Sequence, residues 1–161
     1  MTFRSIDPVL FYGVSHVTAA LGEKHPELGT EVKVGGTVYE WVYNAANSDI
    51  NPGYGCVTLA GSTTPYSVTV SAATSADLVY GVVKNATLTT GTYGWVVKKG
   101  IVAIEMGATS GTVAAGGLVE IGANGVFVPV SNTTGNNAPA CGKAMAEIVS
   151  SASGNAYINV Y

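Results

Sequence analysis

The chain has 161 residues, a formal net charge of −3 and 17 charged side chains, and 47% of its residues are hydrophobic. This length fits one domain, and so few basic residues exclude a broad surface for nucleic acid or for an anionic membrane. A surface this poor in charge indicates that part of it meets another protein. The alternative is a surface rich in Ser, Thr and Asn that stays soluble without charge.

β-Branched residues dominate the composition, with 23 Val and 17 Thr against 7 Leu. Such side chains lose rotamer freedom in helices but pack well on a pleated sheet. The 21 glycines stand mostly between short apolar runs, as tight turns between short strands require. The sequence therefore predicts an all-β fold, a single compact β-sandwich or barrel with an N-terminal arm.

The N-terminal stretch differs from the rest, because nine of the 17 charges fall within the first 49 residues. We divide the chain into an arm, residues 1–28, and a β domain, residues 29–161. Asp7 and Pro8 are typical of a helix start that would run to about Leu21, but the β-branched residues there favour an extended arm with at most a short helical turn. The alternative is that the segment packs back on its own domain.

No segment of the sequence reads as a targeting or membrane signal. The first residues lack the apolar core of a signal peptide, and no apolar run approaches the ~20 residues of a membrane helix. We expect synthesis in the cytoplasm and a soluble product.

From Gly29 onward the apolar pattern has a period of two. The diglycine at residues 35–36 precedes the run 37–43, which predicts a hairpin with Tyr39, Trp41 and Tyr43 on one face. This aromatic row is either ordinary core or a platform for a sugar or a partner, and the sequence leaves both open.

Further strands are expected at residues 56–59, 66–70 and 78–83, separated by Gly, Ser, Thr and Pro. Residues 93–106 contain two strand-like runs around the Lys98-Lys99-Gly100 segment, which we interpret as a turn or a bulge.

Asn124-Gly125 between residues 118–121 and 126–130 is the strongest hairpin signal in the chain, because both residues tolerate a positive φ. After a polar loop, residues 143–149 and 156–161 read as two strands around a turn at 153–155.

The sequence predicts no catalytic, cofactor-binding or metal site. His16 and His25 lie in no zinc motif, and the Ser15 segment matches a nucleophile elbow only in part. Cys56 and Cys141 are 85 residues apart and are expected to be small buried thiols, with their pairing left open.

Glycoside hydrolysis would need two carboxylates across a cleft. Glu105, Glu120 and Glu147 lie in strand-like runs, where each is expected to face solvent. We therefore expect a protein that is not an enzyme.

Three blocks carry a resemblance to a known family: residues 28–45 (LGTEVKVGGTVYEWVYNA), residues 79–100 (VYGVVKNATLTTGTYGWVVKKG) and the part from GANGVFVPV at residue 122 onward. They resemble the capsid decoration, or cement, proteins of tailed bacteriophages. The likeness lies in a pattern of strand, Gly-Val-Val, glycine turn and Gly-Trp-Val, and residues 1–27 are outside it.

The resemblance implies a structural virion protein that decorates and stabilises the outer surface of a capsid. It would bind the major capsid protein as a homotrimer, without cofactors and without nucleic acid or membrane as partners. The alternative is a carbohydrate- or receptor-binding virion module.

The arm is expected to fasten the domain to its neighbours, because its bunched apolar residues cannot bury themselves. Aromatic residues dominate interface hot spots. The expected capsid contacts are Phe3, Arg4, Ile6, Leu10, Phe11 and Tyr12.

Overall fold

The computed structural model describes residues 18–19, 26–59, 62–70, 79–84, 86–130 and 140–160. Within these residues the secondary structure is strand apart from one 3₁₀ turn, η1 (Ala123–Gly125). The all-β prediction is therefore confirmed. The strands are β1 (Thr18–Ala19), β2 (Glu31–Val34), β3 (Thr37–Asn44), β4 (Gly55–Thr58), β5 (Ser67–Val70), β6 (Val79–Val83), β7 (Tyr93–Glu105), β8 (Leu118–Ile121), β9 (Phe127–Pro129), β10 (Gly142–Ala144) and β11 (Ser153–Asn159).

Strands β3, β5, β4, β6 and β7 close into a small barrel, because β7 pairs with β3 as well as with β6. The β3–β5 pair is parallel and the other pairs of the ring are antiparallel. β-Branched and aliphatic side chains fill most of the interior. This barrel core consists of Val42, Ile50, Cys56, Val68, Val83, Leu88 and Val96.

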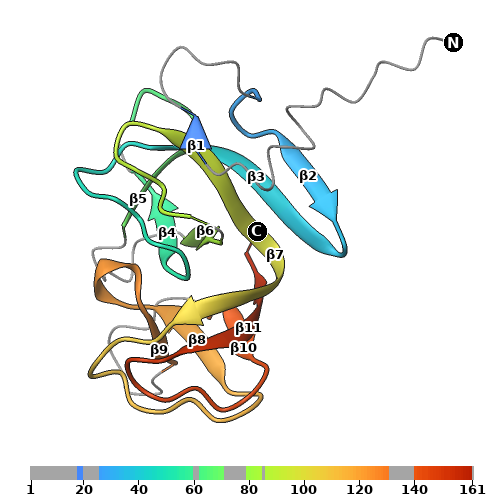
Figure 1. Ribbon diagram of the computed structural model, residues 1–161, viewed down its shortest axis with the longest axis vertical. Coiled ribbons are helices and arrows are strands. Elements are labelled where there is room, and N and C mark those ends of the chain that lie inside the picture. The colour runs from blue at the N-terminus through green and yellow to red at the C-terminus, as the bar shows by residue number, and fades with distance from the viewer. Residues whose placement is uncertain are drawn as a thin grey trace, which may run out of the picture.

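The second half of β7 belongs to another sheet, in the order β7-β11-β10-β8-β9. Figure 1 shows β7 running from the upper half of the molecule into the lower half, where β8 to β11 lie. A β-bridge between Phe127 of β9 and Met106, which follows β7, brings β9 back towards the end of β7. The larger core cluster lies here, with Val102, Ile104 and Ile158 among its members, and it continues along the outer wall of the barrel through Trp41 and Trp95.

A β-bulge in β7 joins the two halves. Val38 pairs with Lys99 while Tyr39 pairs with Val97, so Lys98 is the extra residue. The prediction of a turn or bulge here is confirmed as a bulge, and the two expected strands are one continuous strand. The backbone at Gly100 then takes φ 125°.

The two predicted glycine hairpins are confirmed. Gly35 and Gly36 have φ 56° and 82° between β2 and β3. Asn124 and Gly125 have φ 57° and 80° between β8 and β9. Both turns use the left-handed region that these residues tolerate.

The predicted turn at residues 153–155 is wrong, because these residues begin β11. Ile148 packs directly over Gly154, where a Cβ would lie 2.5 Å from its Cγ1. The glycine thus allows a close approach and makes no turn. Of the expected strand 143–149 only the start belongs to β10, and the chain reverses at residues 149–152, where Ser151 has φ 57°.

Two residues of the predicted arm pair with the domain, since Thr18 and Ala19 lie opposite Gly94 and Tyr93 of β7. Residues 1–17 and 20–25 lie outside the described residues. The division into an arm and a domain therefore stays a prediction.

Both cysteines are buried free thiols, as expected, and they lie in different cores. Burial raises the pKa of Cys56 and of Cys141 from 9.0 to about 12.

Replacing Gly100 by Ala should destabilise the protein more than the same change at Gly91. A Cβ at Gly100 would lie 2.7 Å from Thr37 Oγ1 and 2.9 Å from its Cα, whereas Gly91, at φ 74°, has nothing within 4 Å. We expect a loss of about 1 kcal/mol for Gly91→Ala and about 3 kcal/mol for Gly100→Ala, measured by urea unfolding. Equal losses would contradict the role assigned to the bulge.

Stability should fall as the pH rises above about 9. Below that pH the thiols are protonated in both states; above it those of the unfolded chain ionise, while the folded ones hold their protons until about pH 12. For each thiol, the free energy of unfolding should fall by about 2–3 kcal/mol between pH 8 and pH 11. The double variant Cys56→Ala/Cys141→Ala should lose correspondingly less of its own pH 8 stability over that range. Parallel declines in the two proteins would refute this assignment.

Candidate interaction surface

The outer face of the second sheet carries a row of side chains across four strands. Ile101 of β7 lies opposite Tyr157 of β11, Tyr157 opposite Lys143 of β10, and Lys143 opposite Leu118 of β8. Directly opposed residues point to the same side of a sheet, so these four share one face. Met145 directly follows the last residue of β10, and its amide donates a hydrogen bond to the Asn155 carbonyl of β11.

A second row lies beside the first. Lys33 of β2 is opposite Val38 of β3, Val38 is opposite Lys99 of β7, and Lys99 is opposite Asn159 of β11. Lys99 and Asn159 are two residues from Ile101 and Tyr157, so the two rows lie on the same face of the sheet.

The side chains of this face are open to solvent. Ile101, Leu118, Met145 and Tyr157 are 38–53% exposed, although most large apolar side chains of the described residues are buried. Lys33, Lys99 and Lys143 are exposed as well. We call these four apolar residues and three lysines the lysine face.

Two shallow hollows of about 250 Å³ each lie on this surface. One lies between Leu118, Lys143 and Tyr157. The other lies between the β2–β3 hairpin and the end of β11, where Glu31 joins Lys33 and Lys99. Both are bordered by Asn159, so the hollows adjoin.

A buried polar network stands next to the bulge. The Glu40 carboxylate accepts a hydrogen bond from the Tyr80 hydroxyl at 2.7 Å and pairs with Lys98 Nζ at 3.1 Å. Lys98 Nζ also lies 4.0 Å from the centre of the Tyr80 ring. Burial, and then the bond to Glu40, raise the pKa of Tyr80, so this hydroxyl stays protonated. Each group of this trio is bonded to another, which suits a structural role joining β3, β6 and β7.

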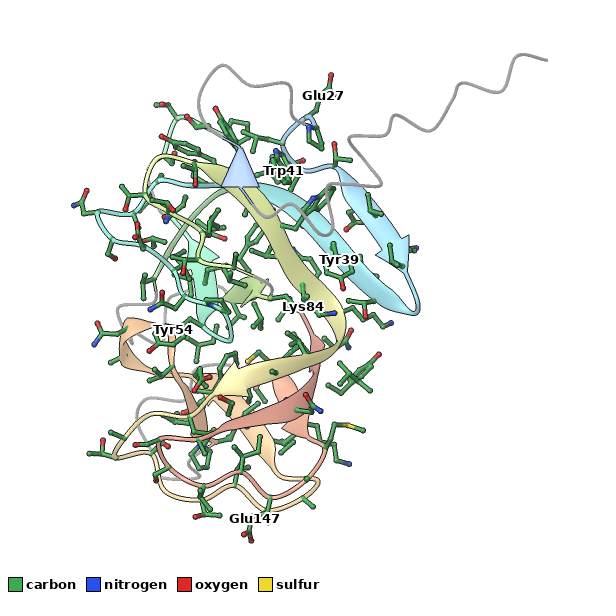
Figure 2. The ribbon with its side chains drawn as sticks, in the orientation of Figure 1. Glu27, Tyr39, Trp41, Tyr54, Lys84 and Glu147 are labelled. Atoms are coloured by element: carbon green, nitrogen blue, oxygen red, sulfur yellow. The ribbon has the colours of Figure 1, made fainter. Side chains whose placement is uncertain are left out.

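Lys84 makes a similar contact at the barrel wall. Its Nζ donates to the Tyr39 hydroxyl at 2.8 Å, and Figure 2 shows the two side chains on neighbouring parts of the wall. Lys84 and Lys98 are therefore already partnered, whereas Lys33, Lys99 and Lys143 form no ion pair with any residue that the structure describes.

The aromatic row of β3 proves to be mainly core. Tyr39 and Trp41 are buried, and Trp41 packs edge-on against Trp95 with the ring centres 5.0 Å apart. Tyr43 is partly buried against Tyr93. The row therefore offers no flat platform for sugar stacking.

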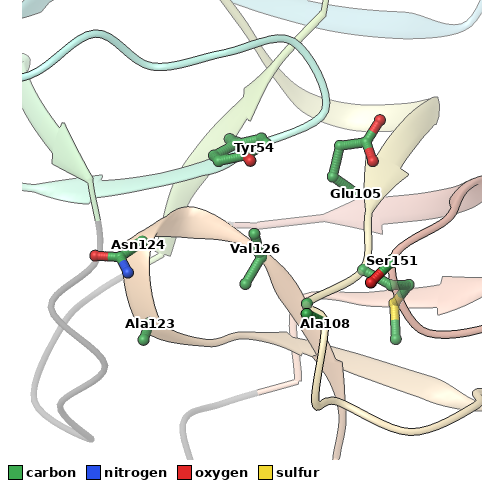
Figure 3. A pocket seen from close by; sticks show the side chains of 9 residues that line it. Tyr54, Glu105, Ala108, Ala123, Asn124, Val126 and Ser151 are labelled. Carbon is green, nitrogen blue, oxygen red and sulfur yellow. The ribbon is translucent and has the colours of Figure 1, made fainter.

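An open pocket of about 430 Å³ lies where the two halves meet. Figure 3 shows Tyr54 and Asn124 on one side of it and Glu105 and Ser151 on the other. Glu105 accepts a hydrogen bond from the Ser153 hydroxyl. An aromatic ring, a carboxylate, an amide and a hydroxyl thus surround one space.

The three carboxylates considered for hydrolysis do not meet in this pocket. Of the three, only Glu105 lines it. Glu147 is exposed at the opposite end of the second sheet (Figure 2). Glu120 was expected to face solvent, and this was wrong, because it lies buried in the interior strand β8, where burial raises its pKa. These three carboxylates therefore form no pair of the kind that hydrolysis requires.

The other candidate residues from the sequence stay predictions. Phe3, Arg4, Ile6, Leu10, Phe11 and Tyr12, like His16 and His25, lie outside the described residues. Within the described ranges no group of His, Cys, Asp and Glu could hold a metal ion, and no helix is long and apolar enough to span a membrane.

The lysine face was not predicted from the sequence. Its signal was present in the alternation of residues 101–105, where Ile101 and Ala103 are exposed and Val102 and Ile104 are buried. Because both sets contain apolar residues, the pattern alone does not tell which set faces solvent.

Comparison with known proteins reveals a likeness in fold. No family model matches the sequence, and no match is found among curated proteins. Among solved structures, the fold is similar to the crystal structure of the head fiber gp8.5 N base of bacteriophage phi29, with a TM-score of 0.52 and 14% sequence identity. The alignment covers 75% of this chain and 94% of that chain. At this identity the likeness establishes a shared fold.

Proposed function

We propose that this chain is a structural virion protein of a bacteriophage, which decorates and stabilises the outer surface of the capsid by binding the major capsid protein as a homotrimer. It acts by contact and carries out no reaction. It is made in the host cytoplasm and works on the assembled particle.

The observation that carries the proposal is the fold likeness. The similar structure is the base of a head fiber, and almost all of that chain, 94%, has a counterpart here. The resemblance of the sequence pattern to capsid decoration proteins supports the same class, because it rests on sequence blocks and does not depend on the fold.

The described surface supports the proposal. A protein that works by contact needs an accessible face on a rigid support, and the lysine face lies on a sheet whose other side is a packed core. The carboxylates are dispersed and the buried polar network is internally paired. These features favour binding over catalysis.

The trimer and the arm belong to the proposal as well. Three copies around a capsid three-fold position would each meet the same capsid surface, and the arm, through Phe3, Phe11 and Tyr12, would add contacts beyond the domain. Thr18 and Ala19 pair with β7, so the arm is attached to the domain at these two residues.

Capsid shells assembled from the major capsid protein of the same genome should bind the purified chain to saturation. We expect trimers at three-fold or quasi-three-fold positions in electron cryomicroscopy and a higher melting temperature of the decorated shells. Deletion of residues 2–17 keeps β1, so it should leave the melting temperature of the free domain nearly unchanged and greatly weaken binding. Shells that stay bare, or monomeric density on them, would overturn the proposal.

The second candidate is a carbohydrate-binding virion module, and the 430 Å³ pocket favours it. Tyr54 offers a ring face, and Glu105, Asn124 and Ser151 offer hydrogen-bonding groups for hydroxyls. The site differs from the aromatic row that the sequence suggested, since Tyr39 and Trp41 are buried.

A glycan array with wild-type protein and the variant Tyr54→Ala tests this candidate. If the pocket binds sugar, wild-type protein should retain specific glycans and the variant should lose them, while Thr58→Ala, an exposed change in β4, should behave as wild type. Absence of specific retention would leave capsid decoration as the function.

A further inference from the structure

We infer that the lysine face is a docking surface for an acidic, partly apolar surface of another protein. The inference rests on the proposed function, which makes the major capsid protein that partner. Beyond that function, the inference specifies which residues of the domain contact the partner and which chemical groups the partner must carry.

The first ground is the apolar content of the face. Ile101, Tyr157 and Leu118 lie in one row, each exposed by more than a third, and Met145 stands beside them. Adjacent strands are about 4.8 Å apart, so the row extends over roughly 14 Å. Large apolar side chains gathered this way on an open sheet mark an interaction site more often than single exposed ones do.

The second ground is charge. The face and its adjoining hollow hold three exposed lysines, Lys33, Lys99 and Lys143, against one exposed carboxylate, Glu31. None of the three lysines forms an ion pair within the described residues, whereas Lys98 is paired with Glu40. This surface is therefore positive in a chain whose net charge is −3. A partner that complements it must bring carboxylates.

The charge also argues against other occupants. A second copy placed face to face would set lysines against lysines, which costs free energy at an interface. Three lysines are too few for a nucleic-acid footprint. A single exposed tyrosine among aliphatic side chains offers little for stacking on a sugar.

The support of the face reduces the cost of binding. The strands that display it are backed by Val102, Ile104 and Ile158, which are buried in the larger core. The backbone is thus ordered before contact, and only the exposed side chains lose freedom.

The area of the face agrees with a partial contact. Two rows that each cross four strands cover on the order of 300 Å². A stable interface buries about 800 Å² per partner. The lysine face would therefore supply part of the contact, leaving room for the arm to add the rest.

The test uses the full chain and shells of the major capsid protein from the same genome. In Lys99→Glu/Lys143→Glu, two positive charges become negative, and we expect affinity to fall on the order of a hundredfold. Lys99→Arg/Lys143→Arg keeps the charge and should bind nearly as wild type. Thr63→Glu/Thr89→Glu/Thr109→Glu/Thr112→Glu adds four negative charges at exposed positions outside the lysine face, so it reaches the same net charge as the first variant and serves as the control for net charge. Wild-type binding should weaken as salt is raised.

Each outcome decides a separate point. Loss of binding only in the lysine-to-glutamate protein, with an unchanged melting temperature and sedimentation, supports the inference. Equal binding by all four proteins overturns it and leaves the proposed function intact. Shells that bind no wild-type protein overturn the proposed function itself. If the glutamate variant changes the oligomeric state in free solution, the occupant is a second copy and the inference is wrong.

Discussion

The bulge in β7 is the constraint on which the two halves of the molecule depend. Side chains alternate along a strand, so a straight strand would turn Trp95 and Val97 to one core and Val102 and Ile104 to the opposite side. The extra residue, Lys98, shifts the alternation by one. All four apolar side chains then reach the same cluster, and one strand serves both the barrel and the second sheet.

The same shift decides which side of the second sheet meets solvent. A slip of one residue would bury Ile101 and expose Val102, because the side-chain period of a strand is two. The extra residue is not left unpaired: Lys98 bonds to Glu40, and the Tyr80 ring covers its ammonium group. A buried pair of this kind contributes little net stability by itself but penalises arrangements in which one charge stays alone. The network at the barrel wall therefore helps fix the face displayed on the other sheet.

Local chemistry made much of the fold predictable. Gly35-Gly36 and Asn124-Gly125 determine their turns through backbone conformation alone, so both hairpins were found. The turn predicted at Gly154 was wrong because the sequence does not tell whether a glycine forms a turn or allows the close approach of a neighbour, here Ile148. The closure of the barrel depends on the pairing of β3 with β7, two strands about fifty residues apart, and no local pattern encodes such a contact.

The lysine face was hidden for a related reason, since its members come from β2, β7, β8, β10 and β11 and meet only through strand pairing. The composition of the lysine face bears on the risk that copies of the protein associate through an exposed apolar surface. Open sheet surfaces with Ile101, Leu118 and Tyr157 attract copies of themselves as well as a partner. Lysines on the same face disfavour the face-to-face packing of two copies and attract carboxylates, so one set of residues disfavours that contact and selects an acidic partner. Specificity then follows from where the few charges of this chain lie, although their number is small.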